Sequence, residues 1–291
     1  MKGQFLMKDH RFLFFSDTHY DFERKLFDGK GYQYDYGDDA DNRMESLLAL
    51  ITEEHKIRPF DAIFLLGDNT HERYENVEVF MKRYVSRFPC PTYLIPGNHE
   101  GHSNDLWRAA VGQDRQYTVD IDDCRFLMLD AFWEITHPHR LQPPDWEFLR
   151  AQTANTDGMS VFLCAHMFQY EDETLAQWLL EHREVVAVFH GHSHNSFPIV
   201  ESFGGKKVIS SGNYSYALTM SEIPMWPEKW GWSVTELSEE SGVWRCRKIF
   251  PTARYPFSEL TLPNRFCERI HCDYNVEKHY GEWESLITDI L

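Results

Sequence analysis

Side chains that bind transition-metal ions gather in five short polar clusters along this 291-residue chain. The clusters are Ser16-Asp17-Thr18-His19, Gly67-Asp68-Asn69, Gly97-Asn98-His99-Glu100, His166 and His190-Gly191-His192-Ser193-His194. In the first and last of them, two potential ligands are spaced two residues apart, which on an extended segment points both side chains to the same face. An ordinary solvated turn can contain any one of these clusters, and only the five together indicate a metal centre.

Taken together, the clusters supply seven nitrogen and oxygen donors: Asp17, His19, Asp68, Asn98, His166, His192 and His194. A closed tetrahedral zinc site takes about four ligands, so seven donors are too many for a single ion. If one carboxylate bridges two ions, each ion receives about four protein ligands and keeps positions open for water and substrate. Asp68 is the expected bridge, because a carboxylate has two oxygens and this one lies between the other clusters. No cysteine joins the set, which favours Mn, Fe or Zn over a thiolate site.

An apolar run precedes each polar cluster, and its composition predicts a buried strand. These runs are Phe12–Phe15, Ala62–Leu66, Tyr93–Ile95, Val161–Ala165 and Val185–Phe189. Helical spacing of apolar residues predicts helices within Met44–Ile51, Val77–Val85, Trp146–Arg150 and Leu175–Leu180, and a closing hairpin is predicted for Val234–Leu237 and Val243–Ile249. Alternating strands and helices indicate a largely parallel, helix-covered sheet. Ligands bind beyond the carboxyl ends of parallel strands, which is where the clusters fall.

In this order, the five clusters resemble the motifs of the calcineurin-like metallophosphoesterase superfamily: D-x-H, G-D, G-N-H-[ED], H and G-H-x-H. The matching blocks run from Asp17 to His194, about two-thirds of the chain. The G-H-x-H ending is most similar to class III cyclic-nucleotide phosphodiesterases and their bacterial relatives. The resemblance implies an α/β fold, a four-layer α/β/β/α sandwich of two mixed β-sheets flanked by helices. We expect one domain over 1–291, with the motif-bearing core in 1–213 and C-terminal strands and an elaboration in 214–291.

The resemblance also implies a binuclear, metal-dependent phosphoesterase that hydrolyses a small phosphomonoester or phosphodiester through attack of a metal-bound hydroxide. One ion would take Asp17, His19, Asp68 and His194, and the other Asp68, Asn98, His166 and His192. His99 matches the family's catalytic histidine, which would protonate the leaving oxygen. The alternative is a metal-binding scaffold or interaction protein on the same fold, without turnover. Another di-metal hydrolase class is disfavoured, because its H-x-H-x-D-H block is absent.

Two residues are predicted to contact the substrate, and one of them marks a departure from better-known branches of the superfamily. Three residues past the bridging aspartate, serine/threonine protein phosphatases carry an Asp-Arg-Gly and purple acid phosphatases a tyrosine. This chain has His71 there, and Arg140, within Phe132–Pro144, is the second predicted contact. Without that aspartate, either His71 or a carboxylate elsewhere has to orient His99. Glu100 lies either behind the metal ligands or on the surface.

Charge and composition exclude several kinds of partner. The formal net charge of −17 disfavours nucleic acid, which binds basic surfaces, and no apolar run approaches the ~20 residues of a membrane span. The N-terminus, Met1–His10, lacks the apolar core of a secretory signal, and the six cysteines form no CxxC, so we expect a cytoplasmic protein. The loop 20–41 and the aromatic stretch Tyr214–Trp232 either line the pocket or are structural. The tail 251–291 either extends the domain or contacts another copy.

Overall fold

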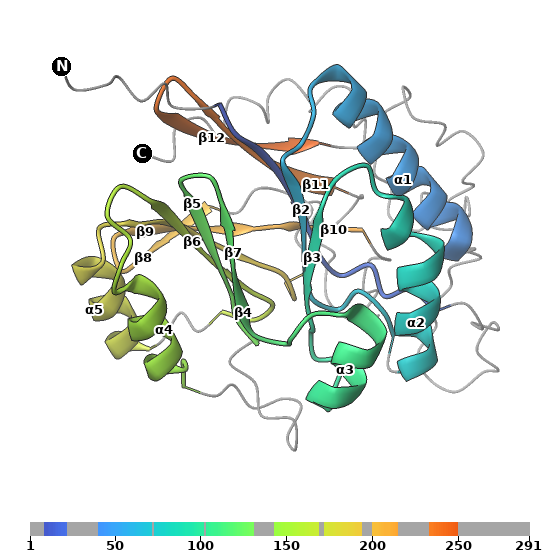
Figure 1. Ribbon diagram of the computed structural model, residues 1–291, viewed down its shortest axis with the longest axis horizontal. Helices are drawn as coiled ribbons and strands as arrows, with labels where there is room; N and C mark the ends of the chain where they lie inside the picture. The colour runs from blue at the N-terminus through green and yellow to red at the C-terminus, as the bar shows by residue number, and fades with distance from the viewer. Residues whose placement is uncertain are drawn as a thin grey trace, which may run out of the picture.

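Two mixed β-sheets face each other in the computed structural model, which describes residues 9–21, 40–71, 73–101, 103–130, 143–168, 172–193, 200–214 and 233–249 (Figure 1). Within these residues, the first sheet contains β1 (Arg11–Phe15), β2 (Ala62–Leu66), β3 (Thr92–Ile95), β10 (Gly212–Asn213), β11 (Ser233–Glu240) and β12 (Val243–Ile249). The second contains β4 (Tyr117–Ile121), β5 (Cys124–Met128), β6 (Ser160–Ala165), β7 (Val185–His190), β8 (Val200–Phe203) and β9 (Lys206–Ser210). The strand orders are β10-β11-β1-β2-β3, with β12 beside β11, and β4-β5-β6-β7-β9-β8.

Parallel pairing brings the carboxyl ends of the strands that carry the polar clusters to one edge of each sheet. In the first sheet β1, β2 and β3 are parallel neighbours, and in the second β5, β6, β7 and β9 are. Antiparallel strands lie beside them, with β11 on β1, β4 on β5 and β8 on β9. The predicted hairpin is confirmed as β11 and β12, joined by Ser241 and Gly242, whose φ angles of 56° and 82° suit a tight two-residue turn.

Helices cover the outer face of each sheet, so the predicted α/β/β/α sandwich is confirmed (Figure 1). The first sheet is covered by α1 (Ala40–Ile57), α2 (Tyr74–Arg83), a 3-10 turn (Val85–Arg87) and α3 (Asn104–Val111), and the second by α4 (Trp146–Thr153) and α5 (Glu173–Glu181). Local signals set the helix ends. The Asp172 carboxylate accepts from the amides of Thr174 and Leu175 at the start of α5, and α3 ends at Gly112 with φ 77°.

Phenylalanine side chains fill the layer between the two sheets. Phe14 of β1 stacks on Phe189 of β7 with 4.1 Å between ring centroids, and Phe64 of β2 lies 4.2 Å from Phe126 of β5. All four rings are fully buried, and burying one such side chain stabilises the fold by roughly 1.5–3 kcal/mol. Since β1 and β7 lead directly into two of the polar clusters, the Phe14–Phe189 contact sets how closely those clusters approach.

Several predicted features lie outside the described residues: Phe132–Gln142 with Arg140, the tail 251–291, most of 20–41 and most of Tyr214–Trp232. From the predicted C-terminal part, 214–291, β11 pairs with β1 and β12 with β11, which extends the first sheet. The division of one domain into 1–213 and 214–291 stays a prediction. No described helix combines the length and the apolar character needed to cross a membrane.

At the opposite ends of the strands, the buried imidazole of His10 joins the two sheets. Its Nε2 lies 2.7 Å from Oδ1 of Asp123, in the β4–β5 turn, and its Nδ1 lies 3.5 Å from Oδ2 of Asp61, just before β2. Asp61 and then Asp123 raise the pKa of His10 above its usual 6.5, although burial opposes the shift. Protonated His10 therefore stabilises the fold below that value, and this contribution is lost as the pH rises through the folded-state pKa.

We expect the variant His10→Phe to be less stable than the wild type mainly at low pH. The phenyl ring keeps the stacking on Phe12 and Trp244 but leaves the two carboxylates without their cation. Thermal unfolding followed by circular dichroism should show a Tm lowered by about 2–4 °C near pH 6 and by less near pH 9. His182→Phe, at a half-buried histidine paired with Glu184, is the matched control and should lower the Tm by less, because a more exposed ion pair contributes little. An equal loss at both pH values in His10→Phe would contradict the charged role.

Candidate metal centre

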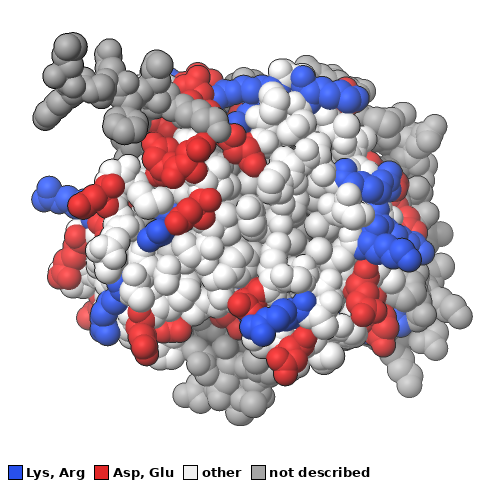
Figure 2. Space-filling view, viewed as in Figure 1, with Lys and Arg blue, Asp and Glu red and all other residues white. Residues whose placement is uncertain are grey.

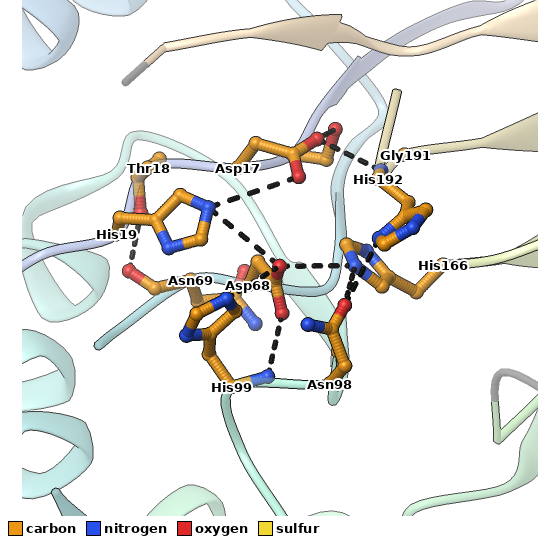
Figure 3. A network of polar contacts seen from close by, with 12 residues as sticks. Asp17, Thr18, His19, Asp68, Asn69, Asn98, His99, His166, Gly191 and His192 are labelled. Carbon is orange, nitrogen blue, oxygen red and sulfur yellow. Dashed lines mark hydrogen bonds and ion pairs between the residues drawn. The ribbon is translucent and has the colours of Figure 1, made fainter. Parts of the chain in front are cut away.

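The predicted metal ligands lie together where the carboxyl ends of strands from both sheets meet (Figure 3). After strands of the first sheet come Asp17 and His19 (β1), Asp68 (β2), and Asn98 and His99 (β3); after strands of the second come His166 (β6) and His192 (β7). The structure thus brings together every predicted ligand that it describes. The seventh predicted ligand, His194, lies outside the described residues, as does Arg140.

Left-handed backbone turns direct these side chains toward one another. The φ angle is 54° at Asp17, 48° at Asp68 and 64° at His192, a region that costs a non-glycine residue roughly 1–3 kcal/mol. Two backbone bonds hold the turns: the Asp17 amide donates to Gly67 O at 3.0 Å and the His19 amide to Asp68 O at 2.9 Å. The sequence analysis expected an extended segment to point Asp17 and His19 to the same face. That reason is wrong, because His19, like Asp17, has a positive φ angle, 42°, and the segment is not extended. The turns make the side chains converge instead.

Glycine is required at two of these strand ends because side chains of neighbouring segments lie against the backbone. A Cβ atom at Gly67, where φ is 85°, would lie 2.5 Å from Cγ of His166. A Cβ atom at Gly97 would lie 2.1 Å from Oδ1 of Asp68. Both distances are far inside van der Waals contact, so any side chain at either position would displace a candidate ligand.

Asp68 lies at the centre of the site, and its Oδ2 atom faces three imidazole rings (Figure 3). The Nε2 atoms of His166, His19 and His99 lie 3.2, 3.6 and 3.9 Å from it. On the side of the second sheet, Oδ1 of Asn98 lies 3.1 Å from Nε2 of His166 and 3.0 Å from Nδ1 of His192. Asp68 is therefore the residue that connects the two halves of the site.

Two groups of potential ligands share Asp68. The first is Asp17, His19 and Asp68, and the second is Asp68, His166 and His192; within each group the ligand atoms lie within 4.8 Å of one another. Asn98 contributes its oxygen beside the second group. The family resemblance implied two sets around a shared Asp68 that contain these residues, with His194 added to the first and Asn98 to the second. A site of this form can hold two cations side by side.

Burial makes the charges in this site strongly interdependent. Asp17 and Asp68 are almost completely buried, and burial, with Asp68 adding to it, raises the pKa of Asp17 to about 7. Burial also opposes ionisation of Asp68, but His166, then His19 and His99, hold its pKa well below its usual range. Burial would lower the pKa of His166, but Asp68 and then Asp17 raise it to about 9. Positive charge is therefore needed here to keep two adjacent carboxylates ionised.

Divalent cations fit this donor set. Carboxylate, imidazole and amide oxygen donors suit Mn, Fe and Zn, and within the described residues no cysteine belongs to either group. Placing a carboxylate in a protein interior costs several kcal/mol unless a cation compensates it, and two divalent ions would supply that compensation for Asp17 and Asp68.

His99 and His71 form a second feature of the site, on its more open side. Their rings stack with 4.9 Å between centroids and 25° between planes, and the ring of His99 meets that of His19 edge-on at 4.7 Å. The His99 amide donates to Oδ1 of Asp68 at 2.9 Å. The sequence left the partner that orients His99 open; in the structure His71 and Asp68 both contact this residue.

Two supporting residues were missed or left undecided at the sequence level. The hydroxyl of Ser16 donates to Oδ2 of Asp17, which also accepts from the His192 amide at 3.0 Å. Glu100 is fully buried, so the surface alternative for it is wrong. Burial, then the neighbouring Asp68, raises its pKa to about 7. The only signal in the sequence was position: Ser16 is next to a predicted ligand, and Glu100 is next to the predicted catalytic histidine.

Comparison with protein families gives the class of protein that this fold and site define. The model for the calcineurin-like phosphoesterase family matches residues 10–196. The chain therefore belongs to the calcineurin-like phosphoesterase family, and membership supports a metal-dependent phosphoesterase with a divalent dimetal centre. A comparison with curated protein sequences finds no match.

Solved structures share this fold at low sequence identity. A dimetal phosphatase from Danio rerio aligns with TM-score 0.60 and 12% identity over 84% of this chain and 96% of its own. The protein TT1561 of Thermus thermophilus aligns with TM-score 0.52 and 13% identity over 84% of this chain and 100% of its own. The NAD nucleotidase NadN of Haemophilus influenzae aligns with TM-score 0.51 and 12% identity over 84% of this chain but 50% of its own. These likenesses establish the fold.

We expect Asp68→Asn to weaken metal binding in both halves of the site, because the amide removes the charge and the second oxygen that both groups share. Asp17→Asn, the matched control, should weaken one half only. The loss in affinity for Asp68→Asn should exceed ~10–100-fold, which is the usual loss when a residue that only supports a metal ligand is removed. Elemental analysis measures the number of ions bound per chain, and titration of Mn²⁺ into metal-free protein measures the affinity of each half of the site. One ion per chain in saturated wild-type protein would contradict the shared-carboxylate arrangement.

Proposed function

We propose that this protein hydrolyses a small phosphoester at a centre of two divalent ions. The proposed ligands are Asp17, His19, Asp68 and His194 for one ion, and Asp68, Asn98, His166 and His192 for the other. The observation that carries the proposal is the sharing of Asp68 by two compact ligand groups at the meeting edge of the two sheets. Two divalent ions in such a centre supply positive charge that stabilises phosphoryl oxygens and activates water.

The protein's own residues would hold and orient the reacting groups. Asp17 is fixed by the Ser16 hydroxyl and the His192 amide, and Asp68 by the His99 amide, so both carboxylates are oriented before any substrate arrives. Such preorganisation lowers the reorganisation that the reaction would otherwise require. The deep burial of the first-sheet carboxylates excludes bulk water from one side of the centre.

His99 is the proposed general acid. Its side chain is 25% exposed, whereas those of His166 and His19 are 0% and 2% exposed, so a substrate can reach His99 from solvent. It also lies beside Asp68, within reach of a phosphoryl group bound at the centre. Imidazole can hold and release a proton near neutral pH, which suits protonation of a leaving oxygen. His71, stacked on His99, is the proposed contact for the rest of the substrate.

The charge of the surface favours a small substrate over nucleic acid. The net charge of −17 becomes −13 when two divalent cations add +4. On the face seen in Figure 2, lysines and arginines lie among carboxylates. Three described arginines, Arg87, Arg108 and Arg125, pair with Glu45, Asp114 and Asp120. Pairing of this kind reduces the positive potential that these described arginines would offer a polyanion. Together with the net charge, it supports a substrate whose charge is confined to the metal pocket.

A substrate panel tests the proposal directly. Metal-free protein reloaded with Mn, Fe or Zn should turn over small phosphomonoesters or phosphodiesters, and chelation should abolish the activity. Comparing nitrophenyl phosphate, bis-nitrophenyl phosphate and nucleotides separates monoester from diester preference. Turnover of long nucleic acid only, with weak salt dependence, would contradict a small substrate. Absence of turnover with two ions bound would favour a metal-binding scaffold.

We expect His99→Ala to keep its metal content and to lose kcat by roughly 10²–10⁴-fold, the usual contribution of a general acid. The loss should be greater for alkyl phosphoesters than for nitrophenyl esters, because only the former need a proton on the leaving oxygen. His71→Ala is the matched control and should raise KM without dependence on the leaving group. Equal losses of kcat on both ester types would leave His99 with an electrostatic role alone.

A further inference from the structure

The buried carboxylate of Glu100 is used entirely as a hydrogen-bond acceptor between two loops. Its Oε1 accepts from the Thr70 amide at 2.6 Å and from the Thr70 hydroxyl at 3.2 Å, and its Oε2 accepts from the Gly97 amide at 2.7 Å. The residue has no measurable exposed surface. Burying a carboxylate is costly unless its oxygens are bonded, and both oxygens of Glu100 accept backbone amides.

Asp68 and Glu100 exchange these bonds reciprocally between the segments that follow β2 and β3. Asp68, after β2, accepts the amide of His99 at 2.9 Å, and Glu100, after β3, accepts the amide of Thr70 at 2.6 Å. The parallel ladder between the two strands pairs Leu66 with Ile95 as its last residues. Beyond that point, this exchange holds the segment of Asp68 against the segment of Asn98 and His99.

Arg115 extends the connection to the second sheet. Its Nη1 donates to the Glu100 carbonyl oxygen at 3.1 Å, and its Nε and Nη2 donate to the two oxygens of Asp130 at 2.8 and 2.9 Å. Asp130 follows β5, the neighbour of the strand that leads to His166. A nearly buried guanidinium therefore fixes the backbone of Glu100 relative to both sheets.

We propose that Glu100 is a positioning residue that sets the spacing between Asp68 and the Asn98–His99 segment, and so controls metal binding by the group that includes Asn98. The proposal rests on the proposed two-ion function. Asn98 is two residues from Glu100 and has its oxygen between His166 and His192. A shift of this segment would move Asn98 and His99 but leave Asp17 and His19, which follow β1, in place.

The variant Glu100→Gln tests this role almost without a change of shape. Both carboxylate oxygens accept N–H groups, so the amide NH₂ of glutamine would face the amide of either Thr70 or Gly97 donor to donor. Glu100→Asp keeps two acceptors on a shorter side chain and serves as the conservative variant. Glu236→Gln is the control for a buried carboxylate elsewhere, because Glu236 accepts from Arg11 and Arg247 in the first sheet.

The experiment is calorimetric titration of Mn²⁺ into metal-free wild type and the three variants, with Tm and kcat measured in parallel. In Glu100→Gln one of the two Mn²⁺ affinities should fall by about 10–100-fold, the usual effect of losing a residue that holds a metal ligand in place. The other affinity should stay at the wild-type value. Glu100→Asp should recover part of that loss. Glu236→Gln should lower Tm and leave both affinities unchanged.

Each other outcome overturns a distinct statement. Two wild-type Mn²⁺ affinities in Glu100→Gln, whatever its Tm, would overturn the positioning role and leave the proposed function intact. Two Mn²⁺ sites in the wild type with the expected selective loss, but no turnover of any phosphoester, would overturn the proposed function and leave the positioning role intact. If Glu100→Gln does not fold, the Glu100→Asp titration decides, and unchanged affinities there would overturn the role.

Discussion

The carboxylate of Asp68 is buried where the two sheets meet, and the surrounding structure is arranged to make that burial possible. Three imidazoles lie within 4 Å of its Oδ2, and the His99 amide bonds its Oδ1. Because the backbone of Asp68 is left-handed and Gly97 lies against its carboxylate, the side chain has little freedom to turn away. A fixed, buried negative charge of this kind attracts cations. Because Asp68 belongs to both ligand groups, its carboxylate can contact two cations.

The distance between the two sheets is set by apolar packing directly behind the site. Phe14 of β1 and Phe189 of β7 stack across the layer, and each lies three residues before its candidate ligand, Asp17 or His192. That contact lets the His192 amide reach the Asp17 carboxylate across the boundary between the sheets. Precise polar geometry therefore depends on a rigid hydrophobic layer, which positions groups better than exposed loops can.

The histidines of the site differ in their exposure to solvent. His19 and His166 are buried against the carboxylates, His99 and His71 are partly exposed, and His192, in the second ligand group, is exposed. Buried carboxylates, with imidazoles accessible on the open side, suit chemistry at the end of a small substrate. The acidic, internally paired surface is consistent with the same kind of substrate.

The sequence alone determined the strands that precede the polar clusters and the identity of the clusters, because apolar runs, turn residues and ligand types are local signals. It missed the β4–β5 hairpin, since the edge strand β4 alternates poorly between buried and exposed positions. Only the tertiary structure decided that Glu100 is buried, that His71 stacks on His99 and that left-handed turns, not strand alternation, bring Asp17 and His19 together. These features depend on contacts between segments far apart in the chain, such as His166 with Leu66, and no local pattern encodes them.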